Sequence, residues 1–379
     1  MRVGVPREVE PGETRTALVP ESVARLRARG LEVAVEAGAG VHAGVTDADF
    51  DRAGAVVMSS AAAVVDASDV ILGVQLPGRA FVARLRAGQT VVMPLDPARR
   101  ADLLQALAAR GVRAVAIDAL PRTTLAQAMD VRSSQATVVG YRAVVVAACA
   151  LPKMFPLMTT AAGTIAPARV LVLGAGVAGL SAIATARRLG AVVEAFDARR
   201  AAREHVESLG ARFVEVPGED AEVAGGYARE VSAEYRLAQA ARIGDRVARA
   251  DVCVTTALVP GRPAPVLVTA AMVEAMRSGS VIVDVAAAEG GNCEVTRPGE
   301  RFVTSGGVIV IGAVNLAAEV PVHASQMWSR NVEKLLVHLI GPDGVTLRLD
   351  ATDAITRAVV VIGGPSAAPA GPAGKGGSA

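Results

Sequence analysis

The stretch from Arg169 to Asp197 constrains the fold of this chain of 379 residues more than any other. An apolar run, RVLVL, leads into the turn GAGVAG, and an alanine-rich segment then precedes a second apolar run that ends at an aspartate. Apolar runs of this kind around a Gly-x-Gly-x-x-Gly turn predict a strand, a helix and a second, parallel strand. This order is that of a βαβ unit that binds the pyrophosphate of a dinucleotide.

Each glycine of the turn has its own physical role. Gly174 allows the tight turn out of the strand, and Gly176 lets the backbone approach a pyrophosphate at the N-terminus of the helix. Gly179 allows that helix to pack closely on the sheet. We therefore expect the whole turn to bind the dinucleotide, through Gly174, Ala175, Gly176, Val177, Ala178 and Gly179.

Asp197 lies about 20 residues beyond the turn, where a carboxylate accepts hydrogen bonds from the hydroxyls of the adenosine ribose. The same charge repels a 2′-phosphate, so this position favours NAD(H) over NADP(H). Arg199 and Arg200 follow closely in the sequence and weaken this preference. We expect Ala198 to belong to the same part of the cofactor site.

Composition limits the classes of protein to which the chain can belong. Hydrophobic residues make up 52% and charged residues 20%, as in a globular protein with a sizeable core. A formal net charge of +2 gives no indication of binding to nucleic acid. Three widely separated cysteines predict neither a disulfide framework nor a zinc site, and the histidines lack partners at ligand spacing, so no metal is expected.

The sequence shows no signal peptide and no span for a membrane. The N-terminus lacks the apolar core of a signal peptide, and no uninterrupted apolar run reaches the roughly 18 residues that a spanning helix needs. The longest candidate, Val138 to Leu151, is broken by Arg142. We therefore expect a cytoplasmic protein, unless another subunit ties it to a membrane.

The rest of the chain alternates short apolar runs with helical segments about ten residues long. This pattern predicts an α/β fold with two Rossmann-like, doubly wound parallel-sheet domains and a cleft between them. Two longer helices, at residues 135–151 and 322–340, would connect the domains and make the first one discontinuous. The expected divisions are a first domain of residues 1–134 and 320–362, a nucleotide domain of residues 135–319, and a disordered Gly/Ala/Pro tail of residues 363–379.

Several long motifs resemble the alanine dehydrogenase and transhydrogenase family, and within it the NAD(H)-binding α subunits of proton-translocating transhydrogenases. The resemblance covers about residues 1–340 and rests on KMFPLMTTAAGTIAPARVLVLGAGVAGL, SLGARFVEV, AGGYAREVS, TTALVPGRPAPVLVT and GSVIVDVAAAEGGNCEVTRPG. It implies an enzyme that binds NAD(H) and exchanges hydride with NADP(H) held on a partner β subunit. It also implies a membrane-spanning part of the α subunit that couples the reaction to proton movement, a homodimer, and peripheral association with the inner membrane.

The resemblance also assigns residues to the nicotinamide end of the cofactor. The family's ring-binding loop corresponds here to PRTTLAQAMDVRSS, in which Leu125 replaces a more polar residue. The implied catalytic residues are Arg122, Gln127, Asp130 and Ser133, and the segment TTALVPG adds Thr256, Ala257 and Leu258 to the cofactor site. Residues 217–227 read by themselves as either a mobile lid or an ordinary loop; Tyr227 matches the tip of a mobile family loop, which favours the lid.

Alanine dehydrogenases share the predicted fold and provide the alternative function. Oxidation of an amino acid requires a general acid or base and a cation for the substrate carboxylate. Those enzymes have Lys where this chain has Gln75 and His where it has Asp96, and Lys153 is the first lysine of the chain. Arg15 matches the shared pattern, but alone it would only anchor a carboxylate or pack within the protein. Asp96 precedes Pro97 and is more simply explained as a helix N-cap.

Hydride transfer between two nicotinamides moves no proton at the reacting carbon, so it does not need these missing groups. It requires only that the two rings be held in contact and that water be excluded. A third possibility is a module that senses NAD(H) without catalysis, but the intact Gln127 and Asp130 argue against it. The sequence therefore favours the NAD(H)-binding component of a transhydrogenase.

Overall fold

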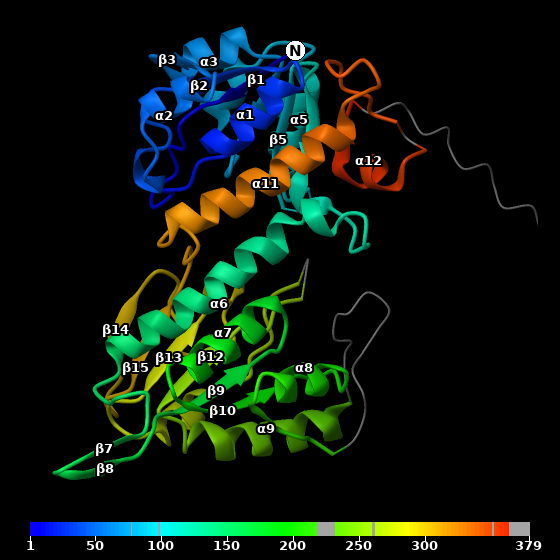
Figure 1. The fold of residues 1–379 in the computed structure, drawn as a ribbon. Coiled ribbons are helices and arrows are strands. Elements are labelled where there is room, and N and C mark those ends of the chain that lie inside the picture. The colour runs from blue at the N-terminus through cyan, green and yellow to red at the C-terminus, as the bar shows by residue number, and fades with distance from the viewer. Residues whose placement is uncertain (77, 98, 218–231, 260–261, 351, 364–379) are drawn as a thin grey trace, which may run out of the picture. The chain divides into compact units, whose positions relative to one another are not determined.

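The computed structural model describes residues 1–76, 78–97, 99–217, 232–259, 262–350 and 352–363 (Figure 1). The predicted lid and its Tyr227, and all of the predicted tail beyond residue 363, lie outside these residues. The chain divides into two compact units, one formed by Met1–Arg132 with Pro321–Ala379 and the other by Ser133–Val320. Within the described ranges, no helix is both long and apolar enough to cross a bilayer.

The first unit is built on a seven-stranded sheet with the order β16-β6-β5-β4-β1-β2-β3. Its strands are β1 (Arg2–Val5), β2 (Glu32–Glu36), β3 (Val56–Met58), β4 (Val70–Leu72), β5 (Thr90–Met93), β6 (Arg113–Ala116) and β16 (Val360–Ile362). All adjacent pairs are parallel except β16 with β6. Its helices are α1 (Pro20–Ala28), α2 (Asp47–Arg52), α3 (Ala61–Ala67), α4 (Arg79–Arg84), α5 (Ala101–Ala109), α11 (Pro321–Leu339) and α12 (Ala354–Val359), with short 3-10 turns η1 (Val41–Ala43), η2 (Ile117–Ala119) and η3 (Gln127–Met129).

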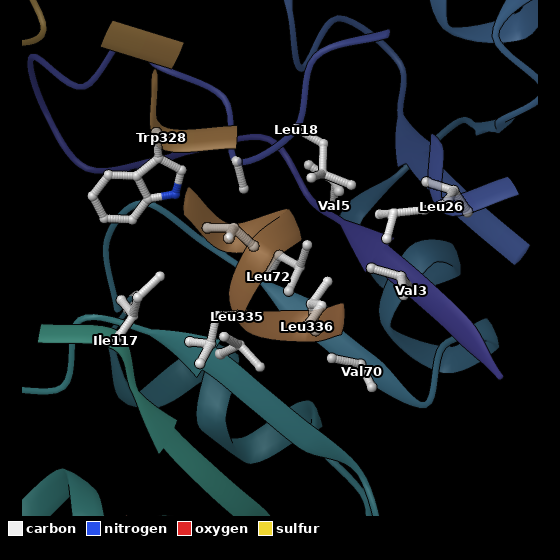
Figure 2. Packing of buried hydrophobic residues seen from close by; sticks show 14 of the residues in the cluster. Val3, Val5, Leu18, Leu26, Val70, Leu72, Ile117, Trp328, Leu335 and Leu336 are labelled. Carbon is white, nitrogen blue, oxygen red and sulfur yellow. The ribbon is translucent and has the colours of Figure 1, made fainter. Parts of the chain in front are cut away.

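The core of the first unit is formed by both of the chain segments that make up this unit. Leu335 and Leu336 of α11 pack in one apolar cluster with Val3 of β1 and Leu72 of β4 (Figure 2). The next residue along β4 toward the N-terminus, Ile71, belongs to a separate cluster. Successive side chains of a strand point to opposite faces of a sheet, so this sheet is buried on both faces, as its continuous apolar runs require.

The second unit contains a seven-stranded sheet with the order β11-β10-β9-β12-β13-β15-β14. Its strands are β9 (Arg169–Leu173), β10 (Val192–Phe196), β11 (Arg212–Phe213), β12 (Val252–Thr255), β13 (Val281–Asp284), β14 (Arg301–Val303) and β15 (Ile309–Gly312), and only β14 runs antiparallel to its neighbour. The helices are α6 (Val131–Ala150), whose first two residues belong to the first unit, α7 (Val177–Arg188), α8 (Ala202–Ser208), α9 (Ala233–Val247), α10 (Ala270–Glu274) and the 3-10 turn η4 (Ala287–Glu289). A separate antiparallel hairpin consists of β7 (Met158–Thr160) and β8 (Gly163–Ile165).

The two sheets share one strand order. In each, the first strand lies at the centre between the second and fourth strands, and the six parallel strands follow the Rossmann order 3-2-1-4-5-6. In each, one antiparallel strand is added at the far edge. The prediction of two Rossmann-like α/β sheets is therefore confirmed.

The structure differs locally from the predicted elements. The helix expected from residue 135 begins at Val131. Asp96 does not cap a helix, because α5 begins only at Ala101, after Arg100 as N-cap. Instead, the C=O of Asp96 accepts the N–H groups of Arg99 and Arg100 in a turn, and its φ of 39° is the one positive value among the described non-glycine residues.

Candidate functional site

The glycine turn lies where the second sheet reverses its strand order. β9 is flanked by β10 on one side and β12 on the other, so the chain leaves β9 and β12 in opposite directions. In open α/β sheets, ligands bind in the crevice at the carboxyl ends of two such strands. The turn Gly174–Gly179 follows β9 and the segment Thr256–Leu258 follows β12. The structure brings these two predicted segments together, because Thr256 Oγ1 donates to the C=O of Gly174 at 3.0 Å.

Two of the three glycines are required by contacts within the chain itself. Gly174 has φ of 100°, and a Cβ there would lie 2.8 Å from Thr256 Oγ1. A Cβ on Gly179 would lie 1.8 Å from the carbonyl oxygen of Gly174. A larger residue at either position would therefore force the turn and the helix apart.

Gly176 is different. A Cβ built on it would meet no atom within 4 Å, and its φ of −76° is open to any residue. Packing of the chain therefore gives no reason for glycine at this position. It is also the N-cap of the twelve-residue helix α7, whose first N–H groups have no partner within the helix and whose dipole favours an anion. These properties fit a phosphate group lying against the backbone.

Asp197 follows β10 directly and contacts the same turn. Its Oδ2 accepts the N–H of Ala175 at 2.8 Å and Arg199 Nη2 at 2.9 Å, while its Oδ1 accepts Arg199 N at 2.9 Å and Arg199 Nε at 2.8 Å. The side chain is only 8% exposed. The structure thus places the predicted ribose acceptor beside the glycine turn, in an ion pair with an arginine that the sequence interpretation considered only as a neighbouring positive charge.

A buried asparagine, not predicted from the sequence, holds the segment that follows β12. Asn292 is fully buried; its Oδ1 accepts the N–H of Ala257 at 2.9 Å, and its Nδ2 donates to the C=O groups of Ala257 at 2.9 Å and Pro265 at 2.7 Å. Both polar atoms of its amide are thus directed at this loop. The residue stands in the motif GGNC, where two glycines before a polar residue are the only local signal of such a role.

Asp284 is the second residue of this support that the sequence interpretation missed. It ends β13 fully buried and accepts hydrogen bonds from Thr255 Oγ1 at 2.9 Å, Thr296 Oγ1 at 2.8 Å, and the N–H groups of Ala286 and Cys293 at 3.0 Å. A buried carboxylate needs such donors to offset its desolvation. The network ties the end of β12 to the loop that carries Asn292. An acid directly after the apolar run SVIV was the available signal.

The predicted ring-binding loop lies in the first unit and is held there by contacts with the core of that unit. Ala126 and Met129 are buried in the core cluster that includes α11, and Asn331 Nδ2 donates to the C=O of Ala128 at 2.8 Å. Gln127 lies between these anchors on η3 and is exposed. The other predicted residues are distributed as follows: Arg122 is exposed before η3, Asp130 is half-buried after it, and Ser133, also half-buried, lies in the first turn of α6 and belongs to the second unit.

The first sheet has its own reversal point, between β1 and β4, and acidic residues gather there. Arg15 binds both carboxylate oxygens of Glu13, at 2.7 and 2.6 Å, and lies 5.6 Å from the centre of the Trp328 ring. Gln75 Nε2 donates to the same carboxylate at 3.0 Å. Burial favours the neutral form of Glu13, but the hydrogen bonds and charge of Arg15 outweigh it and lower the pKa of Glu13 to about 2.

Glu8 lies at the same reversal point, but its pKa is shifted in the opposite direction. It accepts the N–H of Val74 at 2.6 Å and that of Gln75 at 3.2 Å. Burial nevertheless raises its pKa to about 7, and the nearby charge of Glu13 adds to this rise. Arg15 and Gln75, which would face a substrate here, are both bound to the carboxylate of Glu13.

Comparison with known families relates both units to one group of proteins. The N-terminal domain described as alanine dehydrogenase/PNT matches residues 4–139, and the C-terminal domain of the same description matches residues 143–367. The chain belongs to the alanine dehydrogenase/PNT family. The resemblance recognised in the sequence motifs is thereby confirmed.

Within the alanine dehydrogenase/PNT family, the chain is similar both to transhydrogenases and to an alanine dehydrogenase. The first part of NAD(P) transhydrogenase subunit alpha from Rhodospirillum rubrum is 44% identical over 361 residues, which cover 93% of this chain and 94% of that protein. The crystal structure of transhydrogenase from Sinorhizobium meliloti has a TM-score of 0.88 at 40% identity, covering 96% of this chain and 99% of that one. An L-alanine dehydrogenase structure has a TM-score of 0.79 at 28% identity, covering 95% and 94%. The likeness to these transhydrogenases is the stronger, as the sequence motifs predicted.

Proposed function

We propose that this chain is the NAD(H)-binding component of a proton-translocating transhydrogenase, which passes hydride between NADH and NADP⁺ held on a partner subunit. The observation that carries the NAD(H)-binding part of the proposal is the contrast within the glycine turn. Gly174 and Gly179 are required by packing, whereas Gly176 faces open space at the start of a helix at the reversal point of the sheet. A dinucleotide pyrophosphate explains why glycine stands at that position.

The residues around the turn would divide the cofactor between them. The backbone of residues 174–179 would hold the pyrophosphate, Asp197 and Ala198 the adenosine ribose, and the loop of Thr256, Ala257 and Leu258 the part between pyrophosphate and ring. Asn292 and Asp284 would hold that loop in position without touching the cofactor. Bound NADH supplies a hydride at C4 of its dihydronicotinamide.

The loop of Arg122, Gln127, Asp130 and Ser133 would orient the nicotinamide ring. Its two buried anchors and the hydrogen bond from Asn331 hold the backbone on either side of Gln127, so that an exposed amide is presented from a fixed turn. Rigid presentation is what a reaction that depends on ring placement requires. Gln127 would bind the ring carboxamide or a second nicotinamide.

The side-chain contacts at the reversal point of the first sheet argue against amino-acid oxidation. That reaction needs a cation for the substrate carboxylate and an acid or base beside its carbon. Arg15 is bound through two nitrogens to Glu13, which lies with it in the protein interior, and Gln75 is neutral and bound to the same carboxylate. Hydride transfer between nicotinamides uses neither group.

The partners follow from the same proposal. An NADP(H)-binding β subunit would bring the second nicotinamide, and a membrane-spanning part of the α subunit would place this chain at the cytoplasmic side of the inner membrane and couple it to protons. A homodimer is supported by the hairpin β7–β8, which extends away from the sheet of its unit (Figure 1). Met158 and Ile165 on it, and Leu157 before it, are exposed. An isolated hairpin is marginally stable in water, so a second copy covering it would stabilise it.

The test is reconstitution. The purified chain is mixed with the NADP(H)-binding subunit, and reduction of an NADP⁺ analogue by NADH is followed by absorbance. We expect reduction that requires both proteins, and no reduction of NAD⁺ by alanine with this chain alone. Failure to reduce the analogue with both proteins present would contradict the proposal, and alanine-dependent NAD⁺ reduction without a partner would establish the dehydrogenase instead.

A further inference from the structure

The acceptor positions of Asp197 are all filled by the chain. A carboxylate has about four lone-pair positions, two on each oxygen. Each oxygen of Asp197 accepts one backbone N–H, from Ala175 on Oδ2 and from Arg199 on Oδ1, and each accepts one nitrogen of the Arg199 side chain. A ribose hydroxyl that donates to this carboxylate must therefore replace one of these donors.

The two kinds of donor differ in how easily they can leave. The N–H of Ala175 belongs to the glycine turn, and the N–H of Arg199 follows Asp197 by two residues, so both are fixed by the backbone. The Arg199 guanidinium ends a long side chain that is 20% exposed and has several rotatable bonds, so other rotamers are open to it. Its departure frees one position on each oxygen. The vicinal 2′- and 3′-hydroxyls of a ribose need that same number of acceptors.

We propose that Arg199 is an internal competitor of the adenosine ribose and thereby sets the discrimination between NAD(H) and NADP(H). Without cofactor, its guanidinium occupies the two acceptor positions of Asp197; the ribose diol of NADH displaces it. This inference rests on the proposed function, because it assigns Asp197 to the ribose. It adds a specificity role for a residue that would not touch the reacting ring.

The displaced guanidinium has a second consequence. It remains tethered two residues from Asp197, and so it stays near the ribose 2′ position. A 2′-phosphate is repelled by Asp197 but is a strong bidentate partner for arginine. Arg199 therefore weakens NADH binding by competition and partly compensates the repulsion of NADPH. Its removal should change the two affinities in opposite directions, which a merely structural ion pair would not do.

The experiment measures dissociation constants of NADH and NADPH for the full chain, from the fluorescence of the dihydronicotinamide, in the wild type and in Arg199→Met. Methionine keeps the apolar part of the side chain and removes every donor. Arg203→Met is the matched control, because Arg203 is a nearby exposed arginine whose carboxylate partners are Glu207 and Glu215. Thermal unfolding without ligand checks that each variant is folded.

We expect Arg199→Met to bind NADH roughly fivefold more tightly, as for removal of a part-exposed ion pair that competes with ligand. It should bind NADPH at least about threefold more weakly, and Arg203→Met should leave both constants unchanged. Parallel weakening of both nucleotides, or no change in either, would overturn the inference while leaving the proposed function intact. A wild-type chain that binds no NADH would overturn both together.

Discussion

Asn292 binds both backbone polar groups of Ala257, with 2.9 Å to the N–H from its Oδ1 and 2.9 Å to the C=O from its Nδ2. The two residues lie on loops that follow different strands, and the contact gives the segment after β12 one fixed backbone conformation. The side chain itself is buried away from solvent. It is therefore a support for the proposed cofactor loop rather than a contact to the cofactor.

Asn292→Ala should lower the free energy of unfolding by roughly 1–3 kcal/mol, since it removes three part-buried hydrogen bonds to the backbone of Ala257 and Pro265, each worth about 0.5–1.5 kcal/mol. It should also weaken NADH binding. Urea unfolding followed by circular dichroism measures the first effect. Val266→Ala changes an exposed side chain of the same loop and serves as control. If both variants lose equally little, Asn292 does not support the loop.

Gly176→Ala and Gly179→Ala should fail in different ways. The first adds a methyl group in open space, so stability should stay within about 0.5 kcal/mol of the wild type, while the dissociation constant of NADH rises about tenfold or more because the methyl group occupies the pyrophosphate position. The second places its Cβ 1.8 Å from a carbonyl oxygen and should cost about 2 kcal/mol or more of stability. Calorimetry and NADH titration separate the two, and wild-type NADH binding by Gly176→Ala would remove the turn from the site.

Glu8→Gln should change how stability depends on pH. Burial raises the pKa of Glu8 from 4.5 to about 7, so the folded state holds a proton that the unfolded state releases. Its stabilising contribution is complete below pH 4.5 and is lost as the pH rises to about 7. Glu8→Gln stays neutral at every pH. Its free energy of unfolding should therefore rise relative to that of the wild type across this interval, by a difference on the order of 2 kcal/mol.

Chemical denaturation between pH 4.5 and 8 tests this expectation. Glu10→Gln, in an exposed position of the same segment, is the control and should follow the wild-type curve. Glu13 is left unchanged in these experiments. Because its pKa is lowered to about 2, its own contribution to stability is lost only below the pH range that is measured. Parallel curves for the wild type and Glu8→Gln would show that the buried glutamate does not take up a proton on folding.

Gln127→Ala should slow hydride transfer much more than it weakens NADH binding. The side chain is exposed on η3 between two buried anchors, so its loss should leave the loop in place and remove only the amide that orients the ring. Stopped-flow transfer rates in the reconstituted system and NADH titration of the chain alone give the two quantities. Thr124→Ala, exposed on the same loop, is the control. Equal losses in rate and binding would reduce Gln127 to a binding residue.

The sequence predicts features that depend on short spacing. The turn GAGVAG, its two strands and Asp197 are readable because neighbouring residues determine the turn and the helix start. The same holds for the central strands of both sheets, which are buried apolar runs. Arg199 shows the limit of this approach: its charge was visible, but its bidentate pairing with Asp197 depends on a side-chain conformation that spacing does not specify.

Contacts between distant segments could not be predicted in this way. Asn292 reaches Ala257 across 35 residues, and nothing in either segment alone indicates the pairing. The proline after Asp96 predicts a helix cap, yet the backbone of Asp96 has φ of 39° and turns the chain before α5 begins. The conformation there is set by Asp118, whose carboxylate accepts the N–H groups of Leu95 and Asp96 at 2.9 Å each.

The packing of α11 against β1 has a consequence for synthesis of the chain. Leu335 and Leu336 complete the apolar cluster that contains Val3, so the first unit lacks part of its core until the ribosome has passed residue 336. The second unit is one continuous segment, Ser133–Val320, and is finished earlier. At about 5–20 residues per second, the nascent N-terminal unit must wait several seconds or more for α11. We therefore expect the unit Ser133–Val320 to fold first, although its translation begins second.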